Sequence, residues 1–108
     1  MRKMTKHKMK SITAQELSTL LHYNSNVQLI DVREPEEHAE FDIGGELIPL
    51  GEIVRQIDKI STDRPVILYC HHGIRSQIAI QRLMEKYPFD NLVNLIGGTA
   101  AWEKQFGV

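Results

Sequence analysis

The sequence has a single cysteine, no long apolar run and no strong excess of charge of either sign. One cysteine cannot form an internal disulfide, and this favours a reducing compartment such as the cytoplasm. The absence of about 18 consecutive apolar residues argues against a transmembrane helix, and the amino terminus lacks the apolar stretch of a secretory signal. A net charge of −1 gives no general case for nucleic-acid or membrane binding. The sequence therefore predicts a cytoplasmic protein.

What is present is the composition of one ordinary globular domain. The 108 residues can build one core but not two. An apolar content of 42% and a charged content of 25% are typical of soluble proteins. The first ten residues carry five basic side chains and no acidic one. We expect residues 1–10 to form a flexible basic tail and residues 11–108 to form the folded domain.

Apolar spacing and chain-breaking residues divide the folded part into alternating strands and helices. Short apolar runs predict strands at 11–12, 27–32, 46–48, 65–69 and 92–96. Spacings of three and four residues predict helices at 14–24, 35–40, 53–60 and 74–87, and a last helix from residue 99. Thr13 and Glu16 form a capping box for the first helix, and Thr99 is expected to cap the last. This alternation favours an α/β fold with three layers, in which helices flank a small central parallel sheet.

The single cysteine, Cys70, stands between a predicted strand and a predicted helix. In an open α/β sheet ligands bind at the carboxyl ends of the strands, and amides at a helix start favour negative charge. Gly73 permits a sharp turn, Arg75 adds positive charge, and Ser76 supplies a hydroxyl or caps the helix. These features lower the pKa of the thiol and favour the nucleophilic thiolate. We therefore expect a reactive Cys70, although most free cysteines are small buried apolar residues.

His71 and His72 follow Cys70 directly and suggest a metal site. Adjacent side chains point in different directions, however, and no second cluster of Cys or His supplies further ligands. We expect no metal here. One of the two histidines is expected to be solvated at the loop rim, and the other faces either substrate or solvent. Three more histidines have no motif around them and are expected at the surface: His7, His22 and His38.

Three motifs occur in order along the chain. They are Asp31-Val32-Arg33-Glu34-Pro35-Glu36-Glu37, Tyr69-Cys70-His71-His72-Gly73-Ile74-Arg75-Ser76 and Gly97-Gly98-Thr99-Ala100-Ala101-Trp102. Each motif alone is weak, but the three together, at their present separations, resemble the single-domain rhodanese-like sulfurtransferase family. The resemblance extends from Ser11 to Val108 and implies a three-layer rhodanese-like domain.

The resemblance also implies roles for individual residues. Cys70 would accept a sulfane sulfur as a persulfide and pass it to a thiophilic acceptor. The persulfide would be cradled by the backbone amides of the loop that contains His71, His72, Gly73, Ile74, Arg75 and Ser76. Asp31 and Arg33 would brace this loop from the end of the neighbouring strand, or would form an ion pair with no part in the chemistry. No cofactor is implied. The implied donor is a small sulfur anion such as thiosulfate or a protein persulfide, and the implied acceptor is a thiol or cyanide.

The length of the loop distinguishes the chain from relatives of the same fold. Four residues separate Cys70 from Arg75, whereas the related dual-specificity phosphatases and arsenate reductases have five. The longer loop makes a wider cradle for a tetrahedral oxyanion, so the shorter one favours a single sulfur. The chain also has no clear general acid for a phosphate leaving group, and Asp42 is the one candidate. We therefore expect sulfur transfer rather than phosphatase activity.

Two departures from the family pattern affect the rim of the site and the donor. The family usually has Gly-His-Ile-x-Gly-Ala after the short second helix, whereas residues 41–46 lack that histidine and the segment is one residue shorter. The residue after the cysteine is often a cation in members that use thiosulfate. His71 is largely neutral at pH 7, so we expect thiosulfate to be a poor donor. The alternative function is a non-catalytic or redox-sensing binding module.

Overall fold

A computed structural model describes residues 9–24 and 26–107, and it contains one five-stranded sheet. Every strand pairing is parallel, and the strand order is β1-β5-β4-β2-β3. The strands are β1 (Lys10–Ile12), β2 (Gln28–Asp31), β3 (Glu46–Leu47), β4 (Val66–Tyr69) and β5 (Leu92–Leu95). The predicted α/β class with a small central parallel sheet is therefore confirmed.

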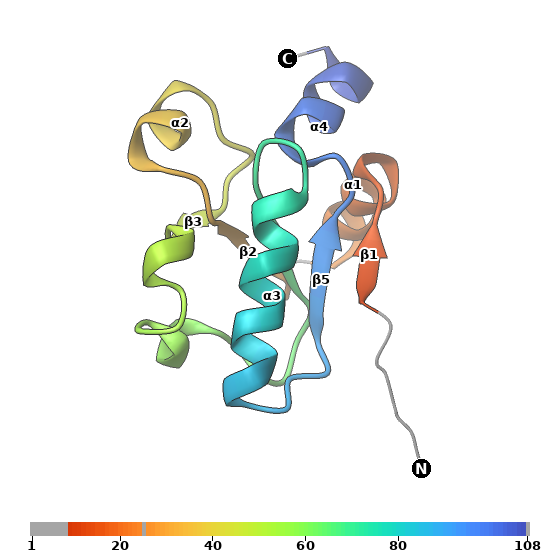
Figure 1. Ribbon diagram of the computed structural model, residues 1–108. Helices are drawn as coiled ribbons and strands as arrows, with labels where there is room; N and C mark the ends of the chain where they lie inside the picture. Colours follow the sequence, from red (N-terminus) through yellow and green to blue (C-terminus); the bar gives the residue numbers. More distant parts are fainter. Residues whose placement is uncertain (1–8, 25, 108) are drawn as a thin grey trace.

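Helices cover both faces of this sheet, as predicted. They are α1 (Ala14–Tyr23), α2 (Pro35–Glu40), α3 (Ile74–Lys86) and α4 (Gly98–Phe106). Helix α3 lies in front of the sheet in Figure 1, while α1 and α4 lie behind it and α2 lies beyond the end of β2. Among the described residues no helix combines the length and the apolar character needed to cross a membrane.

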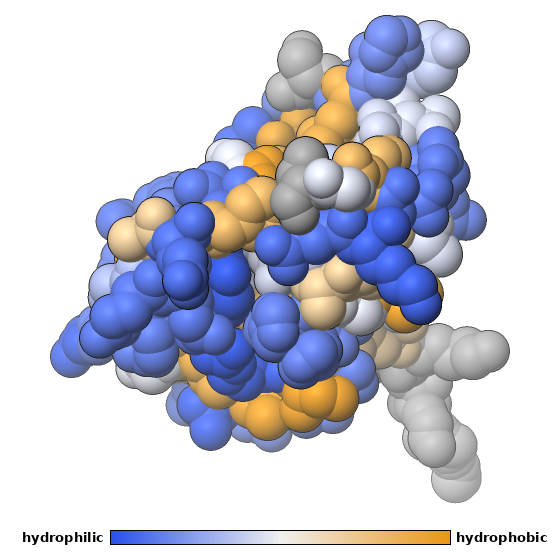
Figure 2. Space-filling view, turned by 90° about the horizontal axis from the view of Figure 1, so that it is seen from above, coloured by the Kyte–Doolittle hydropathy of each residue, from blue (hydrophilic) through white to orange (hydrophobic). Residues whose placement is uncertain are grey.

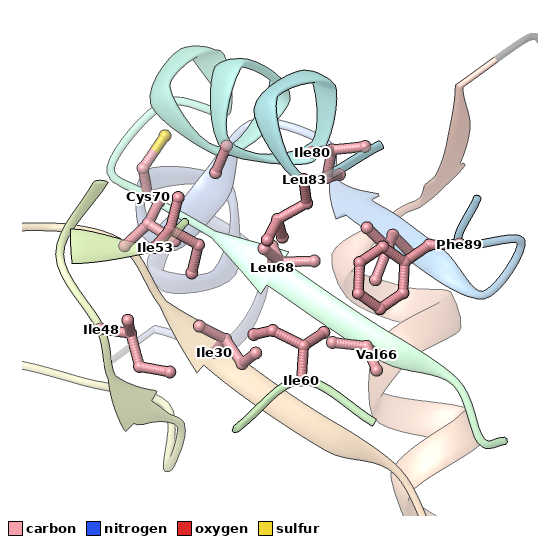
Figure 3. Packing of buried hydrophobic residues seen from close by; sticks show 13 residues of the cluster. Ile30, Ile48, Ile53, Ile60, Val66, Leu68, Cys70, Ile80, Leu83 and Phe89 are labelled. Carbon is pink, nitrogen blue, oxygen red and sulfur yellow. The ribbon is translucent and has the colours of Figure 1, made fainter. Parts of the chain in front are cut away.

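The central strand β4 is buried on both of its faces. Val66 and Leu68 pack with α3 and the segment at 50–60 in one core cluster, whereas Ile67 and Tyr69 belong to the cluster with α1 and α4. This alternation follows from the two-residue period of a strand. Figure 3 shows the first cluster, with Cys70 at one end of it. The thiol is thus attached to the strand that the fold buries most completely.

Two local predictions about helices were wrong. Residues 53–60 form no α-helix; instead, two short 3-10 helices, Leu50–Glu52 and Ile57–Lys59, are joined by turns. Turns of three residues, with one four-residue turn closed by the Gln56 amide and the Glu52 carbonyl, place Ile53 and Ile60 in the core about as a helix would. Gly97, not Thr99, is the cap of α4, because the chain enters this helix with φ of +74° at Gly97.

The amino-terminal predictions have different outcomes. The capping box is confirmed, because the Thr13 side chain accepts from the Glu16 amide at 3.0 Å and the Glu16 carboxylate accepts from the Thr13 amide at 2.9 Å. Lys10, placed in the predicted tail, is the first residue of β1. The rest of the tail up to residue 8 lies outside the described residues, so its flexibility stays a prediction.

Candidate active site

Cys70 follows the central strand β4 and leads into a short loop before α3. Its side chain is only 1% exposed. The loop turns at Gly73, whose φ of +94° lies in the left-handed region that glycine adopts without steric cost. Gly73 is also the cap of α3, so the loop closes onto the first turn of that helix. This turn therefore brings the backbone amides at the start of α3 close to the Cys70 sulfur.

Polar groups of the loop contact the Cys70 sulfur. The Gly73 amide donates to Sγ at 3.0 Å, and the Ser76 Oγ lies 3.5 Å from it. The Ser76 hydroxyl also donates to the Asn94 side-chain oxygen at 2.5 Å. A single hydroxyl proton serves one acceptor at a time, so an ionised Cys70 competes with Asn94 for it. Ser76 thus supplies a hydroxyl to the site and does not cap α3.

The surroundings of Cys70 lower the pKa of its thiol below the ordinary value of 9.0. Burial is the largest influence and by itself raises the pKa, because it disfavours the charged thiolate. Hydrogen bonds from the Ser76 hydroxyl and from the amides of Ser76, Gly73 and His72 outweigh this effect. The thiolate is therefore stabilised by directed donors rather than by exposure to water.

The start of α4 packs against the Cys70 loop. The Thr99 amide donates to the Cys70 carbonyl at 2.9 Å, and the Ala100 amide donates to the His71 carbonyl at 3.0 Å. Gly98 permits this approach, because a Cβ there would lie 2.2 Å from the Cys70 carbonyl oxygen. The third sequence motif therefore holds the loop that carries the thiol.

The two histidines of the loop have different environments. His71 is partly buried, and its Nδ1 lies 3.2 Å from the Thr99 hydroxyl. His72 is exposed, as is Ile74 with 62% of its surface accessible. Within residues 9–24 and 26–107, no group of three or more His, Cys, Asp or Glu side chains is arranged to hold a metal ion.

Arg75 forms an ion pair that no sequence motif predicts. Its two terminal nitrogens donate to the two carboxylate oxygens of Glu37 on α2, each at 2.8 Å. This hydrogen bonding lowers the pKa of Glu37 to about 2 and raises that of Arg75. The positive charge expected to act on the thiol is thus balanced by a carboxylate. No signal in the sequence joins these residues, because 38 positions separate them.

Asp31 and Arg33 are buried and bind each other. Two guanidinium nitrogens of Arg33 donate to the Asp31 carboxylate at 2.7 to 3.1 Å, and Arg33 also donates to the Phe41 carbonyl at 2.5 Å. Their hydrogen bonds therefore go to the segment around α2 rather than to the loop at 70–76. Since α2 carries Glu37, any support that they give to Arg75 is indirect.

His38, expected at the surface, is partly exposed and also binds a buried group. Its side chain is 25% exposed, and its Nδ1 lies 2.9 Å from the buried Asp31 carboxylate. His22 is exposed, as predicted, and His7 lies outside the described residues. Asp42, considered above as a general acid, accepts a hydrogen bond from the Gly44 amide at 2.6 Å.

A cavity of about 520 Å³ adjoins the loop between α2 and α4. Its lining includes His71 and Thr99 from the loop and its support, and Arg33 and Phe41 from the segment around α2. Three carboxylates complete the lining: Glu37, Glu40 and Glu103. Acidic side chains therefore make up three of the seven residues that bound the space next to the loop.

Comparisons with known proteins agree with this geometry. A family model described as the rhodanese-like domain matches residues 13–105. The chain is 39% identical over 95 residues to the uncharacterized protein YqhL of Bacillus subtilis. This match covers 87% of this chain and 72% of that protein. It is 35% identical over 94 residues to a sulfurtransferase of Allochromatium vinosum, with 86% of this chain and 87% of that protein covered.

A solved structure has the same architecture. The rhodanese-like domain protein from Staphylococcus aureus superimposes with a TM-score of 0.78 at 35% sequence identity, covering 87% of this chain and 91% of that one. Some relatives are much longer: the chain spans only 25% of a probable adenylyltransferase/sulfurtransferase, MoeZ, of Mycobacterium tuberculosis. The shared unit is therefore the domain described above.

Proposed function

Because the chain belongs to the rhodanese-like domain family, we propose that it transfers sulfane sulfur through a persulfide on Cys70. The observation that carries this proposal is the hydrogen bond from the Gly73 amide to Sγ at 3.0 Å. It places a fixed donor on the atom that must become a nucleophile. Relatives whose names include sulfurtransferase support the same reaction class.

The loading step needs only the thiolate and a donor. With thiosulfate, the Cys70 thiolate attacks the outer sulfur, a new S–S bond forms, and the donor S–S bond breaks. Sulfite leaves with the electron pair of that bond, and the protein retains a persulfide anion. The amides that stabilise the thiolate, together with the remaining loop amides, are suited to hold the negative charge of the added sulfur.

The discharge step returns the protein to its starting state. An acceptor thiol, ionised by loss of its proton to solvent, attacks the outer sulfur of the Cys70 persulfide as a thiolate, and the bond from that sulfur to Sγ breaks. The electron pair goes to Sγ as the thiolate, and the acceptor leaves as a persulfide. Since the low pKa of the Cys70 thiol makes it a good leaving group, the same hydrogen bonds assist both steps.

Mass measurement of the intact protein tests this function. The protein is incubated with thiosulfate, or with a small organic persulfide, and then with cyanide. We expect a gain of one sulfur atom that cyanide removes, and no gain in a Cys70→Ser variant treated in parallel. If neither donor adds a sulfur to the unmodified protein, sulfur transfer is the wrong function for this chain.

A second candidate is a non-catalytic or redox-sensing module, and the near-complete burial of Cys70 favours its non-catalytic form. A buried thiol is the usual state of an inert cysteine. In that case Cys70 forms no persulfide with any donor, and its thiol titrates near the ordinary value. The mass measurement and a pH titration of alkylation rate distinguish the two functions.

A further inference from the structure

Asn94 is a buried polar side chain of β5 that faces helix α3. It is 3% exposed. Since alternate residues of a strand point to the same face, Asn94 shares its face with Leu92, which packs in the cluster that includes α3. The register of the sheet sets Asn94 beside Leu68 of β4, and Figure 3 shows Leu68 and Cys70 in that same cluster. Asn94 and the Cys70 thiol therefore lie on the same side of the sheet.

Ser76, in the first turn of α3, links Asn94 to the sulfur. Its hydroxyl donates to the Asn94 side-chain oxygen at 2.5 Å, and its Oγ lies 3.5 Å from the Cys70 Sγ. Figure 2 looks onto this end of the molecule and shows a largely hydrophilic surface, but Ser76 and Asn94 lie beneath the surface, at 0% and 3% exposure. At this depth the hydroxyl has little contact with bulk water, so Asn94 and the sulfur compete for its one proton.

The charge of Cys70 decides where that proton is needed. A neutral thiol can donate to the Ser76 oxygen while Ser76 donates to Asn94, so each of the three groups has a partner. A thiolate has lost its proton to solvent, and it needs the Ser76 proton for itself. The Asn94 oxygen then loses its donor, and a buried acceptor without a donor costs free energy. The bond from Ser76 to Asn94 therefore favours the thiol over the thiolate.

From this arrangement we infer that Asn94 is a positioning residue that limits how far Ser76 stabilises negative charge on the Cys70 sulfur. The Gly73 amide also donates to Sγ, at 3.0 Å, so the thiolate keeps a fixed donor in either case. A thiolate that is stabilised too strongly is a weak nucleophile, and a thiol attacks best when its pKa lies near the ambient pH. Asn94 thus preserves the reactivity of the sulfur. The effect on ionisation follows from the geometry alone, whereas its consequence for sulfur transfer rests on the proposed function.

Asn94→Leu tests this inference, because it removes the competing acceptor and keeps a similar side-chain volume. The Ser76 proton then serves the sulfur alone. Below the pKa of the thiol, the thiolate fraction should rise about three- to tenfold, which corresponds to a fall in pKa of about 0.5 to 1. The fully ionised thiol should react about two- to threefold more slowly, since nucleophilicity falls with pKa. The rate of reaction with dithiodipyridine, a small disulfide, measures both quantities across pH.

The shape of the pH profile separates this effect from damage to the fold. We expect the variant to react faster than the unmodified protein at low pH and more slowly at high pH, whereas a disturbed fold would change the rate in one direction at every pH. The ionisable groups beside the thiol are His71, His72 and the ion pair of Arg75 and Glu37. They are the same in every variant, so a difference between the profiles reports the ionisation of Cys70.

Two further variants assign the effect to Ser76. In a Ser76→Ala background, Asn94→Leu should leave the thiol pKa unchanged, because the two residues act through one hydrogen bond. Asn91→Leu is the matched control, since the Asn91 amide binds backbone carbonyls of the segment at 61–64 rather than a group of the Cys70 loop. It should lower the free energy of unfolding and leave the thiol pKa unaltered. If Asn94→Leu fails to fold, Asn94→Val makes the same test with a smaller apolar side chain.

An unchanged or higher thiol pKa in Asn94→Leu overturns the inference. An equal fall in the Ser76→Ala background also overturns it, because Asn94 would then act on the sulfur without the hydroxyl. Failure of sulfur transfer gives a different result. If no donor loads Cys70 with sulfur, the reaction with dithiodipyridine still reports the thiol pKa, and the proposed function alone is wrong.

Discussion

Glu37 on α2 accepts hydrogen bonds from both terminal nitrogens of Arg75, each at 2.8 Å. This pair joins α2 to the first turn of α3, next to the loop that carries Cys70. It also reduces the positive charge available to the thiolate, although the charge of Cys70 still contributes to the raised pKa of Arg75. Arg75 therefore acts on the site within a balanced pair and not as an isolated cation.

Replacing Glu37 and replacing Arg75 should shift the pKa of the Cys70 thiol in opposite directions. Glu37→Gln frees the charge of Arg75 and should lower the pKa of the Cys70 thiol, with sulfur loading from thiosulfate faster by about two- to fivefold at pH 7. Arg75→Ala leaves Glu37 unpaired and should raise the pKa and slow loading. Alkylation rates as a function of pH measure the pKa. Shifts of the same sign in both variants would contradict this account.

The same ion pair predicts a dependence of stability on acid. Hydrogen bonding to Arg75 lowers the pKa of Glu37 from 4.5 to about 2 in the folded protein. The pair therefore stabilises the fold fully above pH 4.5, and this contribution is lost as the pH falls from 4.5 to 2. Urea unfolding at several pH values should show a smaller loss in Glu37→Gln than in the unmodified protein. Equal losses would mean that the pair contributes nothing measurable.

Ser76→Ala tests the hydroxyl that lies between Asn94 and the sulfur. Removing it takes away one of the hydrogen bonds that favour the Cys70 thiolate, so the pKa of the thiol should rise. Loading at pH 7 should slow because less thiolate is present. Ser61→Ala, a change of the same kind at a serine whose backbone binds Gln28 and Asn91 instead of the loop, should leave both quantities unaltered. An unchanged thiol pKa in Ser76→Ala would mean that the backbone amides alone stabilise the Cys70 thiolate.

Substitutions of Cys70 separate its chemistry from its packing. Cys70→Ser should abolish loading but cost only about 1 kcal/mol of unfolding free energy, because the new hydroxyl still accepts from the Gly73 amide. Cys70→Ala leaves this amide without its acceptor and should cost more, about 1–3 kcal/mol. Urea unfolding of both variants gives the comparison. A serine variant that fails to fold would favour a purely structural role for the cysteine.

Gly98 should be the glycine that tolerates substitution least. In Gly98→Ala the Cβ would meet the Cys70 carbonyl oxygen at 2.2 Å, so α4 or the loop must move. Gly107 has a similar φ of +71°, but no atom lies within 4 Å of a Cβ placed there. Gly107→Ala should cost about 1–2 kcal/mol from backbone strain alone, and Gly98→Ala at least about 3 kcal/mol together with slower loading. Equal losses of unfolding free energy in the two variants would show that α4 and the Cys70 loop move apart without cost.

Most of the architecture could be predicted from local sequence, because the signals are short-range. The capping box of Thr13 and Glu16 spans three residues, and the buried run before Cys70 marks a central strand by its apolar character alone. The spacing in the segment at 53–60 predicts an α-helix wrongly, since short turns repeat apolar residues at almost the spacing of an α-helix. Only the backbone path distinguishes the two.

Much of the candidate site depends on contacts between distant positions. Cys70, Gly73 and Ser76 lie close in sequence, so their contact followed from one turn. The partner of Arg75 is 38 residues away, and Glu37 looked like any acidic residue of a solvated helix. His38 was placed at the surface for the same reason, although its ring binds the buried Asp31. Ion pairs between residues that are distant in sequence produce no local sequence pattern from which they could be predicted.

Strand β4, which precedes Cys70, is held more firmly in the fold than helix α2, which carries Glu37. Strand β4 lies between two strands and is buried throughout, whereas α2 has six residues and buries none of them. Amides of β4 should therefore exchange with deuterium only through global unfolding, while those of α2 exchange through local opening. The helix that carries Glu37 can then detach and return many times while Cys70 keeps its place, so the Glu37–Arg75 pair opens at a far smaller cost in free energy than the fold itself.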